Sequence, residues 1–495
     1  MTVFNKSHLR LPDLPESVWN ITEVIEHRAR LHPAAPALIL PDRVFSYREL
    51  VTAVHVIAIK LLASGIDKGQ TVGVSMAQTS LHLATLLAIA RIGAIAVPLH
   101  GALTPERRML AARRFNVVTV VSGREDMRLD GWPFIQLAAI DLGRRVPWLP
   151  ATTTRADDPC WLSLSSGTTG DPKGVLRTHG YMLDRVRTDA DARDQHSRLL
   201  PLDLNFSVGF GQALRMLLLG GAVVLAPERT AANLAYMVRS HAVTHWLLSP
   251  AIAEGILELL DDDDVHFPSL VSLRILGGAP SPRLIDAMAR KFTPNVRADY
   301  GVSEVGIVAI ASPEIIRCTP DCAGEVAPWV TVQIVDERER PVPAGQSGRL
   351  RLKADQMFDR FYLDQELTAE RFRDGWYYPY DNARLDADGL LYIEGRQDDV
   401  FNVGGNKVQF RDVETVLEKH PAVREAAAFV LPQLSGLDLL AVAVMVSARL
   451  PTEELLAWAR RELGPICPER LFFVDEFERT MTGKVLRDRL SKTHA

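Results

Sequence analysis

The most informative stretch of this 495-residue chain is Ser165-Ser166-Gly167-Thr168-Thr169-Gly170-Asp171-Pro172-Lys173-Gly174. An apolar run that ends at Leu164 precedes it and Val175-Leu176 follows it, so the pattern predicts a strand, a glycine-rich loop and a second strand. Glycines allow backbone N–H groups to turn toward one point, while the hydroxyl groups and Lys173 add donors and positive charge. Such a loop is typical of a polyphosphate-binding site.

Two other interpretations of this loop are weaker. The spacing differs from the G-x-x-x-x-G-K-[ST] of a Walker loop, and the loop does not open a helix as a dinucleotide-binding fingerprint does. A flexible polar surface loop is the plainer alternative. Ten residues in this order, with Pro172 to stiffen the exit, favour the phosphate loop.

Length, composition and charge indicate a globular protein of two or three domains. Hydrophobic residues make up 47% and charged residues 24%, and the net charge of −5 implies no basic field for nucleic acid. No signal peptide precedes Pro12, and the apolar stretches at 81–99 and 214–226 are interrupted, so no membrane span is expected. Four cysteines lack zinc-site spacing, which favours reduced thiols in a cytoplasmic protein.

Strands and helices are predicted to alternate through the first half of the chain, which is the pattern of a parallel sheet covered by helices. Short strands from Val330 onward indicate a small β subdomain. The last part, about 100 residues long, has strand patterns at Ala426–Leu431 and Leu439–Val446 and a helix near Glu453–Leu463, which predicts a small α+β domain. The expected helix N-caps are Ser46, within a capping box, and Ser80, Thr104 and Ser281.

The stretch Ser165 to Val175 resembles the phosphate-loop signature of the adenylate-forming superfamily. This superfamily contains acyl-CoA synthetases, aryl-CoA ligases and peptide-synthetase adenylation domains. Further stretches resemble its motifs in the same order, and they are Gly277–Pro280, Tyr300–Glu304, Phe372–Asp381, Gly395–Asp399, Asn402–Val408 and Arg479–Arg487. Each stretch alone could be a surface turn, but together they cover the chain from about Ile21 to Leu490 and are specific.

The resemblance implies a binding site for ATP and Mg²⁺. The phosphates would contact Ser165, Ser166, Gly167, Thr168, Thr169, Gly170 and Lys173. The adenosine would contact Gly278, Ala279, Pro280, Tyr300, Asp381 and Arg396. Ser303 would donate to the α-phosphate, and Glu304 would bind Mg²⁺, a cation that prefers oxygen ligands. One departure is Pro379-Tyr380, which stands where the family usually has Thr-Gly before this aspartate.

The C-terminal motifs imply that a mobile domain over 397–495 follows an adenylation domain over 1–396. Asp398 would be the hinge, and Gly404, Gly405 and Lys407 would belong to the loop that guides the arm of the thiol substrate. Lys484 would be the catalytic lysine, placed between two anions in the first half-reaction. A hinge would then exchange Lys484 for a thiol tunnel in the second half-reaction.

The resemblance places the acid against residues 201–211, with Asn205, Phe206, Gly209 and Gly277 as substrate-binding residues. Amino-acid-activating relatives carry an aspartate at the position of Asn205, and a neutral amide cannot offset a buried ammonium. Relatives that activate hydroxybenzoates are similar in having an asparagine followed by an aromatic residue. We therefore favour an aromatic or other small acid over a long fatty chain, with an aliphatic acid beside a turn-capping Asn205 as the alternative.

Taken together, the motifs imply an ATP-dependent acid–thiol ligase that forms an acyl-adenylate, releases pyrophosphate and acylates a thiol. CoA is the expected thiol because the chain ends soon after Arg487, and the phosphopantetheine of a separate carrier protein is the alternative. A ligase that acylates an amine and a luciferase-like oxygenase share the motifs. A non-catalytic nucleotide-binding protein is a rival of another class, but it would need neither Lys484 nor Glu304.

Overall fold

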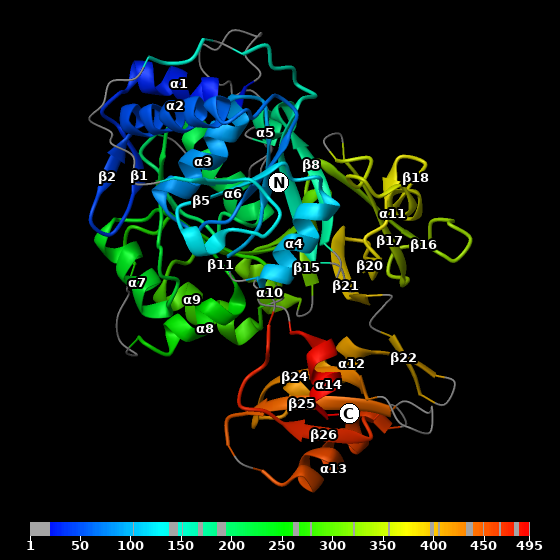
Figure 1. Cartoon of the computed structure of the whole chain (residues 1–495). Coiled ribbons are helices and arrows are strands. Elements are labelled where there is room, and N and C mark those ends of the chain that lie inside the picture. The colour runs from blue at the N-terminus through cyan, green and yellow to red at the C-terminus, as the bar shows by residue number, and fades with distance from the viewer. Residues whose placement is uncertain are drawn as a thin grey trace.

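The structure is a computed structural model that describes residues 20–101, 103–137, 147–150, 152–166, 172–185, 195–260, 267–277, 280–319, 322–354, 357–396, 400–403, 406–431, 439–448, 450–464, 467–479 and 485–494. For residues 165–166, 400–403 and 406–409 it describes the backbone alone. The chain forms a large α/β body and a smaller α+β body, which holds the C-terminal end (Figure 1). None of the described helices is long and apolar enough to cross a membrane.

A six-stranded sheet carries the predicted phosphate loop. Its strands run in the order β6-β5-β3-β4-β7-β8, and they are β3 (Thr71–Val74), β4 (Ile95–Pro98), β5 (Thr119–Ser122), β6 (Phe134–Gln136), β7 (Pro159–Ser166) and β8 (Pro172–Thr178). β7 lies parallel to β4, whereas β7 and β8 form an antiparallel hairpin in which Ser165 is opposite Lys173. The two predicted strands are confirmed, whereas residues 167–171 between them lie outside the described part of the chain.

A second, longer sheet continues through the rest of the large body. Its central strands are parallel, namely β1 (Pro36–Ile39), β9 (Arg198–Leu200), β10 (Ala222–Val224), β11 (His245–Leu248), β12 (Ser272–Ile275) and β13 (Val296–Val302). Its antiparallel strands are β2 (Val44–Ser46), β14 (Gly306–Ala311), β15 (Cys322–Val326), β16 (Val330–Val335), β17 (Gly348–Ala354), β18 (Phe372–Arg373), β19 (Trp376–Tyr377), β20 (Asp381–Leu385) and β21 (Leu390–Arg396). The expected β subdomain from Val330 is therefore joined to this sheet, because β21 pairs with β15.

Helices cover these sheets, and three of the four N-caps expected from the sequence are present. The helices of the large body are α1 (Ile21–Leu31), α2 (Tyr47–Ala63), α3 (Ser80–Arg91), α4 (Pro105–Arg114), α5 (His179–Asp184), α6 (Ser207–Leu219), α7 (Ala231–Ser240), α8 (Pro250–Leu257), α9 (Pro282–Lys291), α10 (Pro313–Cys318) and α11 (Gln365–Arg371). The caps at Ser46, Thr104 and Ser281 are confirmed. The cap at Ser80 is wrong, because the hydroxyl of Thr79 accepts the hydrogen bond from His82 N at 3.3 Å.

The small body has its own sheet and core. Its elements are β22 (Val400–Val403), β23 (Asn406–Gln409), α12 (Phe410–Glu418), β24 (Val423–Leu431), β25 (Leu439–Val446), α13 (Thr452–Leu463), β26 (Arg470–Phe473) and α14 (Arg487–His494). The strand predicted at Leu439–Val446 matches β25. Arg424 Nη2 lies 3.2 Å from Glu258 Oε1 of the large body. The proposed boundary between 396 and 397 borders residues outside the described part of the chain.

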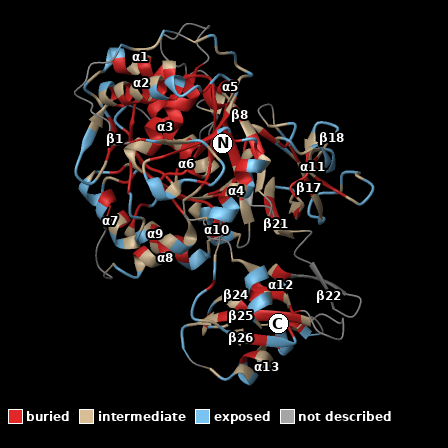
Figure 2. Ribbon diagram, viewed as in Figure 1, coloured by how far each residue is buried: buried red, intermediate tan, exposed pale blue. Residues whose placement is uncertain are grey.

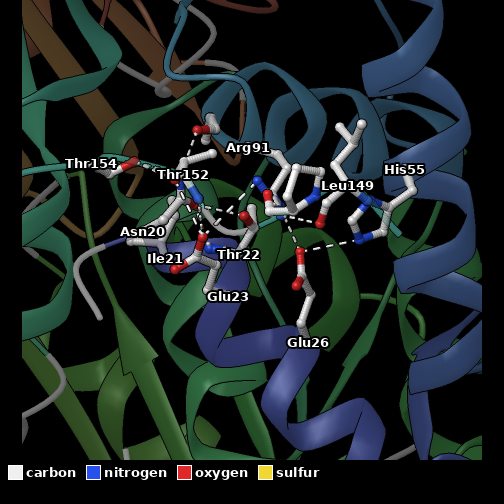
Figure 3. A network of polar contacts seen from close by, with 12 residues as sticks. Asn20, Ile21, Thr22, Glu23, Glu26, His55, Arg91, Leu149, Thr152 and Thr154 are labelled. Atoms are coloured by element: carbon white, nitrogen blue, oxygen red, sulfur yellow. Dashed lines mark hydrogen bonds and ion pairs between the residues drawn. The ribbon is translucent and has the colours of Figure 1, made fainter. Parts of the chain in front are cut away.

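Buried residues fill the interior of both bodies (Figure 2), and the large body also buries a polar network (Figure 3). Glu26 of α1 is 3% exposed, and its Oε1 lies 2.6 Å from Arg91 Nε and 3.1 Å from His55 Nε2. Arg91 Nη2 also donates to the carbonyl oxygens of Leu149 and Pro150, each at 2.9 Å. This network joins α1, α2 and α3 to the segment before β7, so a buried charge here is matched within the protein.

Candidate functional site

Lys173 lies on β8 at the exit of the predicted phosphate loop, and its side chain is half-buried. Burial lowers the pKa of Lys173, and the positive charges of Arg371 and Arg396 lower it further. An anion placed among these cations would be attracted by all of them. The loop residues Gly167, Thr168, Thr169 and Gly170 lie outside the described residues, and only the backbone of Ser165 and Ser166 is described. Their phosphate contacts stay predictions.

Three residues predicted to contact adenosine come together from separate strands. The hydroxyl of Tyr300 on β13 donates a hydrogen bond to Asp381 Oδ2 at the start of β20. Asp381 is opposite Arg396 in the pairing of β20 with β21. Burial raises the pKa of Tyr300, and the Asp381 carboxylate raises it further, so this hydroxyl stays a donor. The arrangement offers a ring face, a carboxylate and a guanidinium, which suits a nucleoside.

Glu304 follows Ser303 in the turn between β13 and β14 and is only 6% exposed. Burial raises the pKa of Glu304, although a hydrogen bond with Tyr377 and the charges of Arg177 and Arg371 oppose the shift. Among the described residues no group of three or more His, Cys, Asp or Glu side chains could hold a metal ion by itself. One buried carboxylate that acts together with substrate phosphates fits Mg²⁺, which is commonly bound in that way.

Tyr380 explains how the chain accommodates its departure from the Thr-Gly pattern. Its φ is 66°, in the left-handed region that a glycine adopts without strain. The guanidinium of Arg371 lies 3.3 Å from the centroid of the Tyr380 ring, and the hydroxyl of Tyr380 is hydrogen-bonded to Glu370. These contacts offset a strain of about 1–3 kcal/mol, so Asp381 keeps its place beside Tyr300.

The acid segment lies between β9 and α6, and Asn205 is 5% exposed. Asp203 Oδ1 accepts from Asn205 N and from Asn205 Nδ2, each at 2.9 Å, and Nδ2 also lies 3.4 Å from Met76 O. Because a carboxylate only accepts, the amide nitrogen must face Asp203. Asn205 Oδ1 is buried and has no hydrogen-bond partner among the residues that the structure describes.

Phe206 and Gly209 belong to the same segment. Phe206 is the N-cap residue of α6, and its ring centroid is 6.0 Å from that of His100. A Cβ at Gly209 would lie 1.9 Å from Asp203 O, so close packing against the backbone of Asp203 requires a glycine at this position. Gly277 lies in the bend after β12 and has a φ of 89°. Of the three residues that follow it in the motif, Gly278 and Ala279 lie outside the described residues and Pro280 is described.

The C-terminal predictions fall mostly outside the described residues. The residues that lie outside the described part of the chain are Asp398, Gly404, Gly405 and Lys484. Lys407 is described by its backbone, which pairs with that of Asn402. The segment with Lys484 is bracketed by a β-bridge between Arg479 and Val485. Arg487 Nη2 lies 2.6 Å from the buried Glu414 Oε1 and anchors the end of this segment to α12.

Several residues of the site carry no motif that would reveal them in the sequence. Asp203 orients Asn205, and its Oδ2 lies 3.5 Å from His100 Nε2. Burial raises the pKa of Asp203, but the bonds from His100 and Asn205 outweigh that effect and lower it overall. Tyr377 lies within the motif Phe372–Asp381, but the motif assigns it no role, and it is hydrogen-bonded to Glu304. Arg177 and Arg371 are far from Glu304 in the sequence, and the fold places their charges near it.

A nucleotide-binding enzyme with two bodies is the class that this fold and site define, and comparison with known proteins gives the family. The profile of AMP-binding enzymes matches residues 25–362, and that of their C-terminal domain matches residues 412–484. The chain belongs to the AMP-binding enzyme family.

Three relatives illustrate the similarity. A 4-chlorobenzoate–CoA ligase of Arthrobacter sp is 29% identical over 495 aligned residues, covering 94% of this chain and 93% of the relative. The phosphinothricin tripeptide synthetase PhsC of Streptomyces viridochromogenes is 30% identical, covering 97% of this chain but 45% of the synthetase. The crystal structure of the anthranilate CoA ligase AuaEII in complex with anthranoyl-AMP superposes on this chain with a TM-score of 0.84. The sequences are 25% identical, and the match covers 98% of this chain and 99% of that one.

Proposed function

We propose that this protein, an AMP-forming acid–thiol ligase, activates an aromatic acid that carries a hydrogen-bond donor on its ring and transfers it to CoA. The observation that carries the proposal is the grouping of Tyr300, Asp381 and Arg396, together with the buried Glu304, which Tyr377 connects to Asp381. A nucleoside pocket beside a buried carboxylate suits ATP with its metal ion. A protein that only bound the nucleotide would have no use for a buried carboxylate that costs energy to ionise.

The residues of this chain would act by holding and neutralising anions. When the acid carboxylate attacks the α-phosphorus of ATP, an acyl-adenylate forms and pyrophosphate leaves, so negative charge crowds at the centre. Lys173, Lys484 and the donors of the loop would stabilise that charge, and Ser303 would orient the α-phosphate. Mg²⁺ bound at Glu304 would supply additional positive charge when present. A thiol then displaces AMP, which is a good leaving group.

The polarity of Asn205 supports an acid with a donor group. Asp203 fixes the amide nitrogen, so the group left for a ligand is the carbonyl oxygen, which only accepts. A ring hydroxyl or amino group would satisfy it, whereas a ring ether or a long alkyl chain would leave it unpaired at a cost of about 1–3 kcal/mol. The named relatives that act on 4-chlorobenzoate and anthranilate agree with an aromatic acid.

CoA is the favoured acceptor, with a carrier protein as the second candidate. The CoA ligases match this chain along nearly their whole length, whereas the tripeptide synthetase matches over less than half of its own. The expected partners are thus a small carboxylic acid and CoA. A cytoplasmic location stays a prediction, and the four cysteines are free thiols.

An acid-dependent exchange of pyrophosphate into ATP tests the proposal. We would compare benzoate, the three monohydroxybenzoates, 2-aminobenzoate and octanoate, and then measure AMP release with CoA. We expect a hydroxy- or aminobenzoate to be preferred and CoA to accelerate AMP release. Asn205→Ala should reduce kcat/KM for that acid by about 5- to 150-fold and change the value for benzoate far less. Equal losses, or a preference for octanoate in the wild type, would contradict the proposal.

A further inference from the structure

Arg177 is a buried cation at the centre of the site, and the proposed reaction assigns it no role. It lies on β8, four residues after Lys173, and is 2% exposed. Its guanidinium carbon lies 4.7 Å from the ring centroid of Tyr181 and 4.3 Å from that of Phe358. These rings enclose the cation but carry no full negative charge. Burial lowers the pKa of Arg177, so keeping a charged group here costs free energy.

One nitrogen of Arg177 connects the two halves of the site. Its Nη2 donates to Ser207 Oγ at 3.1 Å and also to the carbonyl oxygen of Ser303. Ser207 is the first residue of α6 and directly follows Phe206, whereas Ser303 directly precedes Glu304. The acid segment and the nucleotide turn are therefore held by the same guanidinium. The other terminal nitrogen, Nη1, is buried without a hydrogen-bond partner among the described residues.

A second arginine supports the same turn from the same side. Arg185 Nη1 lies 3.5 Å from the carbonyl oxygen of Val305, and its guanidinium carbon is 5.5 Å from the ring centroid of Tyr181. Gly306 has a φ of 95°, and a Cβ there would lie 2.0 Å from Arg185 Nη2. The backbone from 303 to 306 is thus contacted by two arginines, one from β8 and one at the end of α5, and Arg177 also donates a hydrogen bond to Ser207 of α6.

We infer that Arg177 is a positioning residue that couples the two half-sites, so that nucleotide binding at the turn of Ser303 and Glu304 orders the first turn of α6. The inference rests on the proposed function, because it takes that turn as the nucleotide site. Coupling of this kind needs one element that both sites bias, and the shared Nη2 is that element. Without it, a nucleotide would order the turn and leave the acid segment unchanged.

Hydrogen–deuterium exchange of the 495-residue chain, with and without the non-hydrolysable ATP analogue α,β-methylene-ATP and Mg²⁺, tests the coupling and needs no knowledge of the acid. In the wild type we expect the analogue to slow exchange in two peptides, one over 302–307 and one over 206–211. The slowing in each should be about fivefold or more, the lower end of typical coupling. In Arg177→Met the slowing over 302–307 should persist, while that over 206–211 should fall below about twofold.

Two further variants keep the test decisive. Ser207→Ala removes the acceptor on α6 and leaves the bond to Ser303, so it should lose the protection over 206–211 with little effect on folding. Arg108→Met is the matched control, because Arg108 is 4% exposed and bonds Ser75 Oγ and Met127 O, which belong neither to α6 nor to the turn of residues 303–306. We expect it to keep both protections.

The outcomes separate this inference from the proposed function. If the wild type shows no protection over 302–307 and no binding of the analogue, the proposed function fails and the coupling with it. If that protection is present but 206–211 is unaffected, or stays protected in both Arg177→Met and Ser207→Ala, the coupling through Arg177 is overturned and the proposed function stands. If Arg177→Met does not fold, the result with Ser207→Ala decides.

Discussion

Glu26 and Glu304 are buried to nearly the same extent, at 3% and 6% exposed, yet the net shifts of their pKa values have opposite signs. At Glu26, burial raises the pKa, but the bonds from His55 and Arg91 outweigh it and the pKa is lowered. At Glu304, burial prevails and the pKa is raised. The partners of Glu26 thus outweigh the effect of burial, whereas those of Glu304 do not, and an added cation would favour the charged form of Glu304. We regard this difference as the physical mark of a ligand site.

Removal of the Glu26 carboxylate should have the largest effect on stability. Glu26→Gln removes the nearer charge partner of the buried Arg91 and leaves the Glu23 carboxylate at 4.0 Å, which costs about 3–5 kcal/mol. Urea unfolding followed by circular dichroism measures the loss. Pyrophosphate exchange per folded molecule should stay near the wild-type value, because the network lies outside the proposed site. A loss of exchange without a loss of stability would break the contrast with Glu304.

Removal of the Glu304 carboxylate should give the opposite result. Glu304→Gln should slow adenylate formation by about 100- to 1,000-fold, because positive charge at the phosphates is lost. Stability should not fall, since a carboxylate that burial holds unfavourably has been replaced by a neutral group. A titration of the exchange rate with Mg²⁺ checks the role, and a variant with unchanged Mg²⁺ dependence would contradict it.

The pH dependence of stability tests a third buried group, His179. Burial lowers the pKa of His179 to about 4, and His179 Nδ1 accepts from Ile21 N at 3.2 Å, so its ring is neutral. Because the folded pKa lies below the unfolded value of about 6.5, the contribution of His179 to the free energy of unfolding is constant above about pH 6.5. This contribution is lost as the pH falls toward 4, by about 3 kcal/mol. His179→Gln should show a smaller loss over this window, and unfolding at pH 4–7.5 tests it. An identical pH dependence would exclude His179 as its source.

Substitution of Tyr380 should have the smallest effect on stability. At a φ of 66°, Tyr380→Gly removes strain and also the ring over Arg371, so stability should change by less than about 1 kcal/mol. Tyr380→Ala loses the ring but keeps the strain, and should be about 1 kcal/mol less stable than the glycine variant. Thermal unfolding of the two variants measures the difference. An alanine variant as stable as the glycine variant would show that the strain is unimportant.

Local patterns in the sequence predicted the local features of the fold. The hairpin of β7 and β8 and the capping box at Ser46 depend on neighbouring residues, so the sequence indicates them directly. The pairing of β15 with β21 joins strands more than sixty residues apart and could not be predicted in this way. The sequence alone does not show which of the adjacent hydroxyl residues Thr79 and Ser80 caps α3, and the structure shows that it is Thr79.

The candidate site shows the same division. Motifs identified the buried Glu304 and also Tyr300, Asp381 and Arg396, and the fold brings the last three together. Arg177 and Asp203 carry no motif, because their importance comes from what tertiary packing places beside them.

The stabilisation of the folded state by Mg²⁺ and ATP tests the account most directly. A ligand that binds only the folded state at 100 times its dissociation constant adds about 2.7 kcal/mol to the free energy of unfolding. We predict that wild type and Glu26→Gln gain this stabilisation equally, from different starting values, and that Glu304→Gln loses most of it. If the Glu26 and Glu304 variants respond alike to Mg²⁺ and ATP, the distinction between the two buried glutamates is wrong.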